Sequence, residues 1–256
     1  MNLELKNPHS VIATLQTRPL DVVEVRIMHG LPDGAWKEVC RLAENVGVAV
    51  QTGSEDHRQG RRQRRLIPPA EGRVGSSIAV VRPRLDVSLE ELFAPTNETS
   101  MSAVSSAPVG LWLALDCLQD PHNVGAIFRS AAFFGVRGII VTRDRSAPIN
   151  ATVYDVASGG VEYVPFSQPS NLSRAIEVAK AAGLWVLGTS EHAKQDVQAI
   201  PLDRSWLLVL GNEELGLRQL TQKLCDELCR LTPAGPIQSL NVSVAAALLI
   251  SRLTGQ

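Results

Sequence analysis

The stretch LWLALDCLQDPHNVGAIFRSAAFFG, residues 111–135, joins an apolar run of strand length to a helical pattern that ends at a glycine. Four further apolar runs of strand length occur at 138–142, 184–189, 206–211 and 229–232. Helical patterns are found at 124–134, 172–182, 217–228 and 242–253. Strand runs that alternate with helices are typical of a parallel sheet covered by helices. This part of the chain is therefore predicted to be an α/β domain.

A segment rich in Ser, Thr, Pro and Ala separates this region from the first part of the chain. It reads LFAPTNETSMSAVSSAPV over 92–109 and has neither the helical nor the strand period, which is typical of a linker. We therefore expect a small α/β domain at 1–92, a linker at 93–108 and the larger domain at 109–256. The elements expected in the small domain are helices at 10–16 and 34–46 and strands at 22–28, 48–51 and 77–83.

The composition is that of a globular protein. The 256 residues are 45% hydrophobic and 20% charged, and 25 basic residues against 26 acidic ones give a net charge of −1. Bulk positive charge for binding a polyanion is excluded, so any nucleic-acid surface must be local. The start of the chain lacks a signal-peptide pattern, and no run reaches the ~20 apolar residues of a membrane span, so we expect a cytoplasmic protein.

The four cysteines do not form a metal-binding pattern. Cys40, Cys117, Cys225 and Cys229 have no CxxC spacing and no histidine at ligand distance, and the last two fall in a helical pattern. We therefore expect neither zinc nor a disulfide framework.

Three loops that follow predicted strands hold unusual polar residues, and ligands of open parallel sheets bind at such loops. The loops are 116–135, 210–217 and 233–250. Each has a simpler interpretation: Asn123 as a helix N-cap, Arg129 as a solvated helix residue, Glu213 as a residue favoured at a helix N-terminus, and Ser239 or Asn241 as a cap. No dinucleotide-binding, P-loop or nucleophile-elbow fingerprint follows any of the strands.

Together the three loops resemble the SpoU or TrmH family of the SPOUT superfamily, which are RNA ribose 2′-O-methyltransferases that use S-adenosylmethionine. The first motif matches Asn123, Gly125 and Arg129, the second LVLGNEELGL with Glu213, and the third SLNVS at 239–243. The segment VASGGVEYVP, 156–165, is also similar to the family. The resemblance covers 109–256 almost continuously.

The resemblance also implies an architecture. It implies a parallel sheet whose C-terminal segment forms a deep trefoil knot, a homodimer packed through the knotted region, and an N-terminal L30e-like RNA-binding domain. The cofactor site that it implies is formed by Gly188, Thr189, Leu210, Gly211, Leu231, Ser239 and Leu240. The stretch 143–160 is nearest to members that methylate a guanosine ribose of 23S rRNA. Leu231, Thr232 and Pro233 stand where the family usually has Ile-Pro-Met.

Five residues are the catalytic candidates by this resemblance: Asn123, Arg129, Glu213, Ser239 and Asn241. Because a guanidinium is effectively never neutral, we expect a charged Arg129 that orients phosphate or stabilises a forming alkoxide. Glu213 is expected to orient Arg129 or Asn123. Methyl transfer from a sulfonium needs positioning and removal of a proton, and no metal.

A basic run, HRQGRRQRR at 57–65, lies in the small domain. It is either a solvated loop or a contact for RNA phosphates. The predicted RNA-binding residues are Arg58, Arg61, Arg62, Arg64, Arg65, Arg143 and Arg145. Two other functions stay open: a tRNA ribose methyltransferase of the same family, and a non-catalytic RNA-binding factor of ribosome assembly.

Overall fold

The computed structural model describes residues 2–27, 34–52, 77–94, 109–212 and 215–256. They form two compact units, Met1–Pro83 and Arg84–Gln256. None of the helices in these ranges is long and apolar enough to cross a membrane. Glu213 and the arginines of the basic run lie outside the described residues.

The first unit is a small α/β unit with a four-stranded sheet in the order β1-β4-β2-β3. Strand β4 pairs antiparallel with β1 and with β2, whereas β2 and β3 are parallel. The strands are β1 (Leu3–Leu5), β2 (Val22–Ile27), β3 (Val50–Thr52) and β4 (Ile78–Val81), and the helices are α1 (Pro8–Thr17) and α2 (Gly34–Asn45).

The second unit contains the predicted parallel sheet, seven strands in the order β7-β6-β5-β10-β8-β11-β9. All its recorded pairings are parallel. The strands are β5 (Leu111–Leu115), β6 (Gly138–Val141), β7 (Phe166–Ser167), β8 (Trp185–Thr189), β9 (Gln195–Asp196), β10 (Trp206–Leu210) and β11 (Glu227–Arg230). Every residue of β5 and β10 is buried, as expected for central strands covered on both faces.

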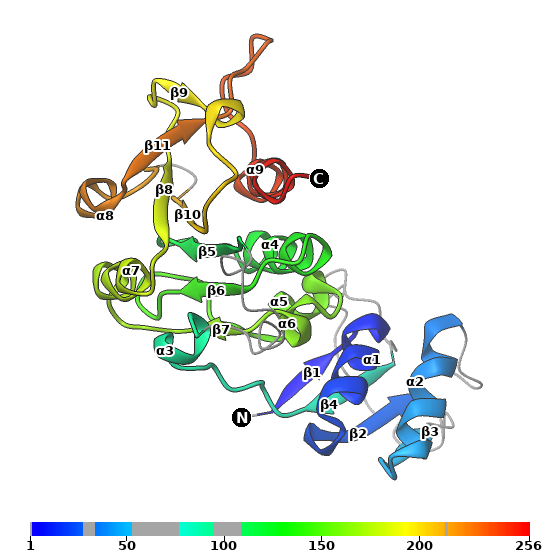
Figure 1. Ribbon diagram of the computed structural model, residues 1–256. Helices are drawn as coiled ribbons and strands as arrows, with labels where there is room; N and C mark the ends of the chain where they lie inside the picture. The colour runs from blue at the N-terminus through cyan, green and yellow to red at the C-terminus, as the bar shows by residue number, and fades with distance from the viewer. Residues whose placement is uncertain (1, 28–33, 53–76, 95–108, 213–214) are drawn as a thin grey trace, which may run out of the picture. The chain divides into compact units, whose positions relative to one another are not determined.

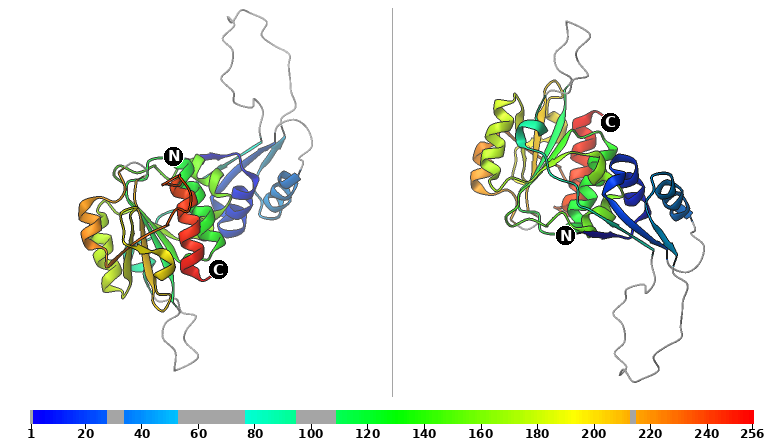
Figure 2. Two further views of the ribbon diagram at one scale, coloured as in Figure 1. Left: turned by 90° about the horizontal axis from the view of Figure 1, so that it is seen from above. Right: turned by 90° about the horizontal axis from the view of Figure 1, so that it is seen from below.

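Helices cover both faces of this sheet (Figures 1 and 2). One face carries α4 (Pro121–Phe133), α5 (Ala151–Ala157), α6 (Gly160–Tyr163) and α9 (Val242–Thr254); the other carries α3 (Leu89–Leu92), α7 (Leu172–Ala181) and α8 (Gln219–Leu224). On the second face, side chains of β5, β6, β8 and β10 pack against α3 and α7 in one apolar cluster. The predicted α/β class with a parallel sheet is confirmed.

The prediction of a helix at 217–228 is wrong in its second half. Helix α8 ends at Leu224 and β11 begins at Glu227, so Cys229 lies on a strand and not on a helix. Strand β11 also begins two residues before the predicted run at 229–232. Pairing with β8 and β9 overrides the helical period of this short segment.

The second unit begins earlier than the predicted linker. Arg84 donates from Nη1 to the carbonyls of Val161, Glu162 and Val164 at 2.6, 2.8 and 3.0 Å. Further along, Leu92 packs in the apolar cluster of the second unit. Residues 84–92, expected in the small domain, therefore belong to the second unit.

Candidate active site at the carboxyl edge of the sheet

Helix α4 places Asn123 beside the carboxyl end of β5. Asp120 is the N-cap of this helix, because its carboxylate accepts from the amide of His122 at 2.9 Å, and Pro121 occupies the first turn, where no amide donor is needed. Asn123 is thus not the cap; it is the third residue of the helix and is buried, with 8% of its surface exposed. Because Asp120 has the capping role, the side chain of Asn123 can bind another group.

That other group is Asn241. The Nδ2 of Asn241 donates to Oδ1 of Asn123 at 3.0 Å. Asn241 is also the N-cap of α9, where its Oδ1 accepts from the backbone amide of Ser243 at 2.9 Å. One asparagine therefore starts the last helix and joins the third motif to the first.

The glycines of the first motif and of VASGG permit close packing of helices. A Cβ on Gly125 would lie 2.8 Å from the carbonyl oxygen of Val153, and one on Gly160 would lie 2.6 Å from that of Phe128. Between α5 and α6, Ser158 and Gly159 have φ of 49° and 98°, which turns the chain sharply. These residues fix α5 and α6 against α4.

Among the described residues, no hydrogen bond joins Arg129 to the Asn123–Asn241 pair. It lies six residues after Asn123 on α4, which corresponds to a rise of about 9 Å and a rotation of about 120° around the helix. Arg129 is exposed, and no described carboxylate forms an ion pair with it. The proposed partner of Arg129, Glu213, lies outside the described residues.

Five of the seven residues predicted to bind the cofactor, all but Ser239 and Leu240, lie at or directly after the ends of three adjacent strands. Gly188 and Thr189 end β8, Leu210 ends β10, and Leu231 follows β11. The Oγ1 of Thr189 donates to the carbonyl of Val209 at 3.1 Å, which ties the ends of β8 and β10 together.

The segment 231–240, which includes the part of the third loop before α9, runs from β11 towards α9. Ser239 and Leu240 are exposed. Residue 236 is proline and has no amide donor; among the described residues, the backbone amides of 234, 235 and 237–240 donate to no protein acceptor. The loop therefore offers both an apolar side chain and backbone donors to a ligand.

Asp196 anchors the start of this loop, a role that the sequence analysis missed. Its Oδ2 accepts from Oγ1 of Thr232 at 2.5 Å and from the amide of Thr232 at 3.1 Å. The hydrogen bond from the Thr232 hydroxyl is the main reason that the pKa of Asp196 is lowered. Thr232 stands where the family usually has proline, and the hydroxyl and amide that proline lacks make this anchor.

A second unpredicted group follows β5. Asp116 is fully buried, and its Oδ1 lies 2.7 Å from Nε of Arg218. Its Oδ2 accepts from Oγ1 of Thr221 at 2.9 Å. Because a buried carboxylate is costly unless it is paired, Asp116 holds Arg218 at the carboxyl edge. The only sequence signal was an aspartate directly after an apolar strand.

The two arginines predicted after β6 differ in their surroundings. Arg143 lies 3.4 Å from Oδ2 of Asp86, which also accepts from the amide of Gln168. Arg145 has no ion-pair partner among the described residues, and its φ of 57° is left-handed. Within the described ranges, no group of three His, Cys, Asp or Glu side chains could hold a metal ion.

Comparison with known proteins identifies the family. The model of the SpoU rRNA Methylase family matches residues 110–251. A Pseudomonas aeruginosa protein named 23S rRNA (guanosine-2'-O-)-methyltransferase RlmB is 36% identical over 97% of this chain and 94% of its own length. The Vibrio cholerae protein of the same name is 35% identical over 94% of this chain and 92% of its own. This chain belongs to the SpoU rRNA methylase family.

Solved structures share its fold. The SpoU methyltransferase AviRb from Streptomyces viridochromogenes, in complex with AdoMet, superposes with a TM-score of 0.74 at 22% identity, over 99% of this chain and 90% of that one. An AdoMet-bound rRNA methyltransferase from Sinorhizobium meliloti gives 0.71 at 20% identity, over 98% and 86%.

Proposed function

We propose that this protein transfers a methyl group from S-adenosylmethionine to the 2′-hydroxyl of a guanosine ribose in 23S rRNA. The observation that carries the proposal is the identity of 36% over 97% of the chain to a relative that bears this activity as its name. Since 94% of that relative is covered as well, the likeness includes both units and not the matched family region alone. Because its substrate is ribosomal RNA, we place the protein in the cytoplasm.

The carboxyl ends of β8, β10 and β11 fit S-adenosylmethionine. The donors of the third loop support this fit: the backbone amides of 234, 235 and 237–240 bind no described acceptor, and they lie beside the exposed Leu240. An adenosine needs this combination of backbone donors and an apolar surface. We assign the cofactor to Gly188, Thr189, Leu210, Gly211, Leu231, Ser239 and Leu240. When bound, the cofactor supplies a methyl group on a positively charged sulfur.

The residues of this chain position the ribose and accept its developing charge. Asn123 and Asn241 lie within one hydrogen bond of each other and can donate to the ribose hydroxyls. Arg129, exposed on α4, binds phosphate or stabilises the forming alkoxide, with Glu213 and Ser239 as further members of the site. The reaction is a displacement that depends on orientation, and no metal enters it.

The knot is part of the proposal. Strand β11 lies on the far side of β8 from β10 and β5, whereas α9 packs against α4 and β5 (Figure 1). The segment that connects β11 to α9 must therefore cross the ends of β8 and β10. A C-terminal segment that is threaded through a trefoil knot crosses in the same way. The first unit, with its basic run, is proposed as an L30e-like RNA-binding domain.

We also propose a homodimer through α9. Val244 and Leu248, four residues apart on one face of α9, are each 49% exposed, and Phe133 on the adjacent α4 is 79% exposed. An apolar face of this kind is typical of an interface. Light scattering at micromolar protein should give the mass of a dimer; the mass of a monomer would contradict the interface.

Ribose methylation mapped on 23S rRNA and tRNA, from cells with and without the gene, tests the activity. One 2′-O-methylguanosine of 23S rRNA should disappear with the gene. A lost tRNA site would instead assign tRNA as the substrate, and unchanged maps would contradict the enzyme. Calorimetry without metal should detect binding of S-adenosylmethionine or its demethylated product.

A further inference from the structure

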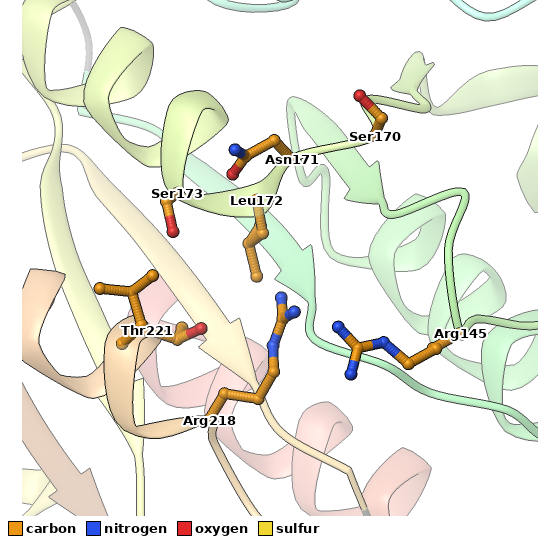
Figure 3. Close-up of a pocket in the computed structure, with 8 residues that line it drawn as sticks. Arg145, Ser170, Asn171, Leu172, Ser173, Arg218 and Thr221 are labelled. Carbon is orange, nitrogen blue, oxygen red and sulfur yellow. The ribbon is translucent and has the colours of Figure 1, made fainter.

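A cavity of about 260 Å³ lies at the carboxyl edge of the sheet, lined by residues that follow β6, β7 and β10. Arg145 and Arg218 line it, together with the polar side chains of Ser170, Asn171 and Ser173 at the start of α7. Figure 3 shows the guanidinium groups of Arg145 and Arg218 pointing into the same space from two different loops. The cavity is separate from the residues assigned above to the cofactor.

The described residues that line the cavity carry a net positive charge. Among the described residues no carboxylate lines it, and the buried Asp116 lies behind Arg218 and neutralises that one guanidinium. Arg145 has no ion-pair partner among the described residues. Both arginines are near enough to the Cys117 thiol to oppose the rise in its pKa, which is caused mainly by burial. One uncompensated positive charge therefore remains for a ligand.

The size of the cavity indicates that it binds one chemical group and not a whole small molecule. Pockets for whole small molecules hold about 300–1,000 Å³, whereas this one is smaller. Hydroxyl and amide donors beside two guanidinium groups suit a tetrahedral oxyanion, because a guanidinium matches phosphate oxygens with paired hydrogen bonds. A small anionic group attached to a larger molecule fits these features.

The loop that carries Arg145 is held in an unusual conformation. Arg145 has a left-handed φ of 57°, which strains a residue that has a Cβ, and such strain is concentrated at functional sites. Here the turn is closed by a hydrogen bond of 2.7 Å between the hydroxyls of Thr142 and Ser146. The loop thus presents the guanidinium of Arg145 to the cavity at the cost of local strain.

We propose that this cavity binds one backbone phosphate of the RNA substrate, between Arg145 and Arg218. The identification of the ligand as RNA rests on the proposed function; the phosphate chemistry follows from the lining. Arg145 contributes the positive charge that no described carboxylate neutralises. Arg218, held in place by Asp116, orients the phosphate through its guanidinium N–H groups. A phosphate held here would fix the RNA on the same edge of the sheet that carries Asn123.

Arg145→Gln is the test variant, since Gln keeps a polar side chain at the strained position and removes the charge. Arg218 is left intact because its loss would leave Asp116 buried without a partner. Arg174→Gln is the matched control: Arg174 lies on α7, its guanidinium is exposed and does not line the cavity, and the change in net charge is identical.

The measurement is the affinity for an unmodified 23S rRNA transcript over a range of KCl concentrations. Each neutralised phosphate contributes about 0.7 to 0.9 to the slope of log affinity against log salt. Arg145→Gln should lower the slope by about that amount, Arg174→Gln should leave it unchanged, and Arg145→Lys should keep the slope. Affinity for S-adenosylmethionine should be equal in all four proteins.

Three results would overturn the phosphate site. The first is an unchanged salt slope in Arg145→Gln, and the second is an equal decrease of the slope in Arg174→Gln. The third is a loss of affinity for S-adenosylmethionine in Arg145→Gln, which would show that the cavity binds the carboxylate of the cofactor. A different result would contradict the proposed function and leave the phosphate site intact. If the wild-type protein binds RNA with the Arg145-dependent slope but methylates no RNA, the phosphate site stands and the enzyme does not.

Discussion

The side chain of Asn241 donates to that of Asn123 across 3.0 Å, although 118 positions separate them in the chain. This bond joins the N-terminal ends of α4 and α9, which also pack along each other. The first and third loops are therefore held as one unit, and a change in either is transmitted to the other.

Asn241 has two roles that two substitutions can separate. In Asn241→Ala both the cap of α9 and the bond to Asn123 are lost, and the missing cap should lower the free energy of unfolding by about 0.5–2 kcal/mol. In Asn241→Ser the cap is kept, but the side chain is too short to reach Asn123. We expect both variants to lose methyl transfer and only Asn241→Ala to lose stability, measured by urea unfolding. Full activity in Asn241→Ser would contradict the role of the bond.

Arg129→Lys tests geometry against charge. Lysine keeps the positive charge and releases a proton more readily, but it has no planar fork. If Arg129 acts through paired hydrogen bonds, Arg129→Lys should lose most turnover while its affinity for S-adenosylmethionine, measured by calorimetry, is kept. Substantial turnover in this variant would refute the bidentate role.

Gly211 is required by packing at the end of β10. A Cβ there would lie 2.4 Å from the backbone carbon of Gly216 and 2.5 Å from the amide nitrogen of Leu217. Since backbone must move, Gly211→Ala should destabilise the protein by about 1–3 kcal/mol in denaturant unfolding. Gly235→Ala is the control, because its Cβ would meet nothing within 4 Å. Equal stability of the two variants would show that the backbone at Gly216 and Leu217 can shift at little cost in free energy.

The sequence predicted the elements with strong periods. The buried runs of β5 and β10 and the helical patterns of α4, α7 and α9 each extend over a complete element, so the α/β class and its parallel sheet follow from them. The loops after β5, β10 and β11 could be located as well, because ligand loops follow the carboxyl ends of strands.

Tertiary contacts decided the features that the sequence did not predict. The segment after Leu224 pairs with β8 as strand β11, although its own pattern is helical. The ion pair of Asp116 with Arg218 and the anchor of Thr232 on Asp196 join residues far apart in the chain. The spacing of apolar residues along the chain cannot predict such long-range pairs.

Two thiols, that of the buried Cys229 and that of the half-buried Cys225, should make stability fall at alkaline pH. Burial is the main cause that raises the pKa of Cys225 and of Cys229 from the ordinary value of 9.0 to about 12. In the unfolded chain these thiols ionise near 9, whereas in the fold they stay protonated, so their contribution is complete below 9 and is lost as pH rises towards 12. Urea midpoints across this window measure the loss. A variant with alanine at both positions should show a weaker decline; an identical decline would assign it to other groups.

The basic run at 57–65 remains a prediction of the sequence, and salt dependence tests it. If Arg58, Arg61, Arg62, Arg64 and Arg65 contact phosphates, each neutralised phosphate releases counterions and steepens the slope of log affinity against log salt by about 0.7 to 0.9. Changing all five to Gln should therefore flatten the slope by several units and weaken the binding of 23S rRNA. Affinity for S-adenosylmethionine should be unchanged, because the proposed cofactor residues lie in the other unit. An unchanged slope would mean that the run is only solvated, and recognition of rRNA would then depend on the rest of the first unit and on Arg143 and Arg145.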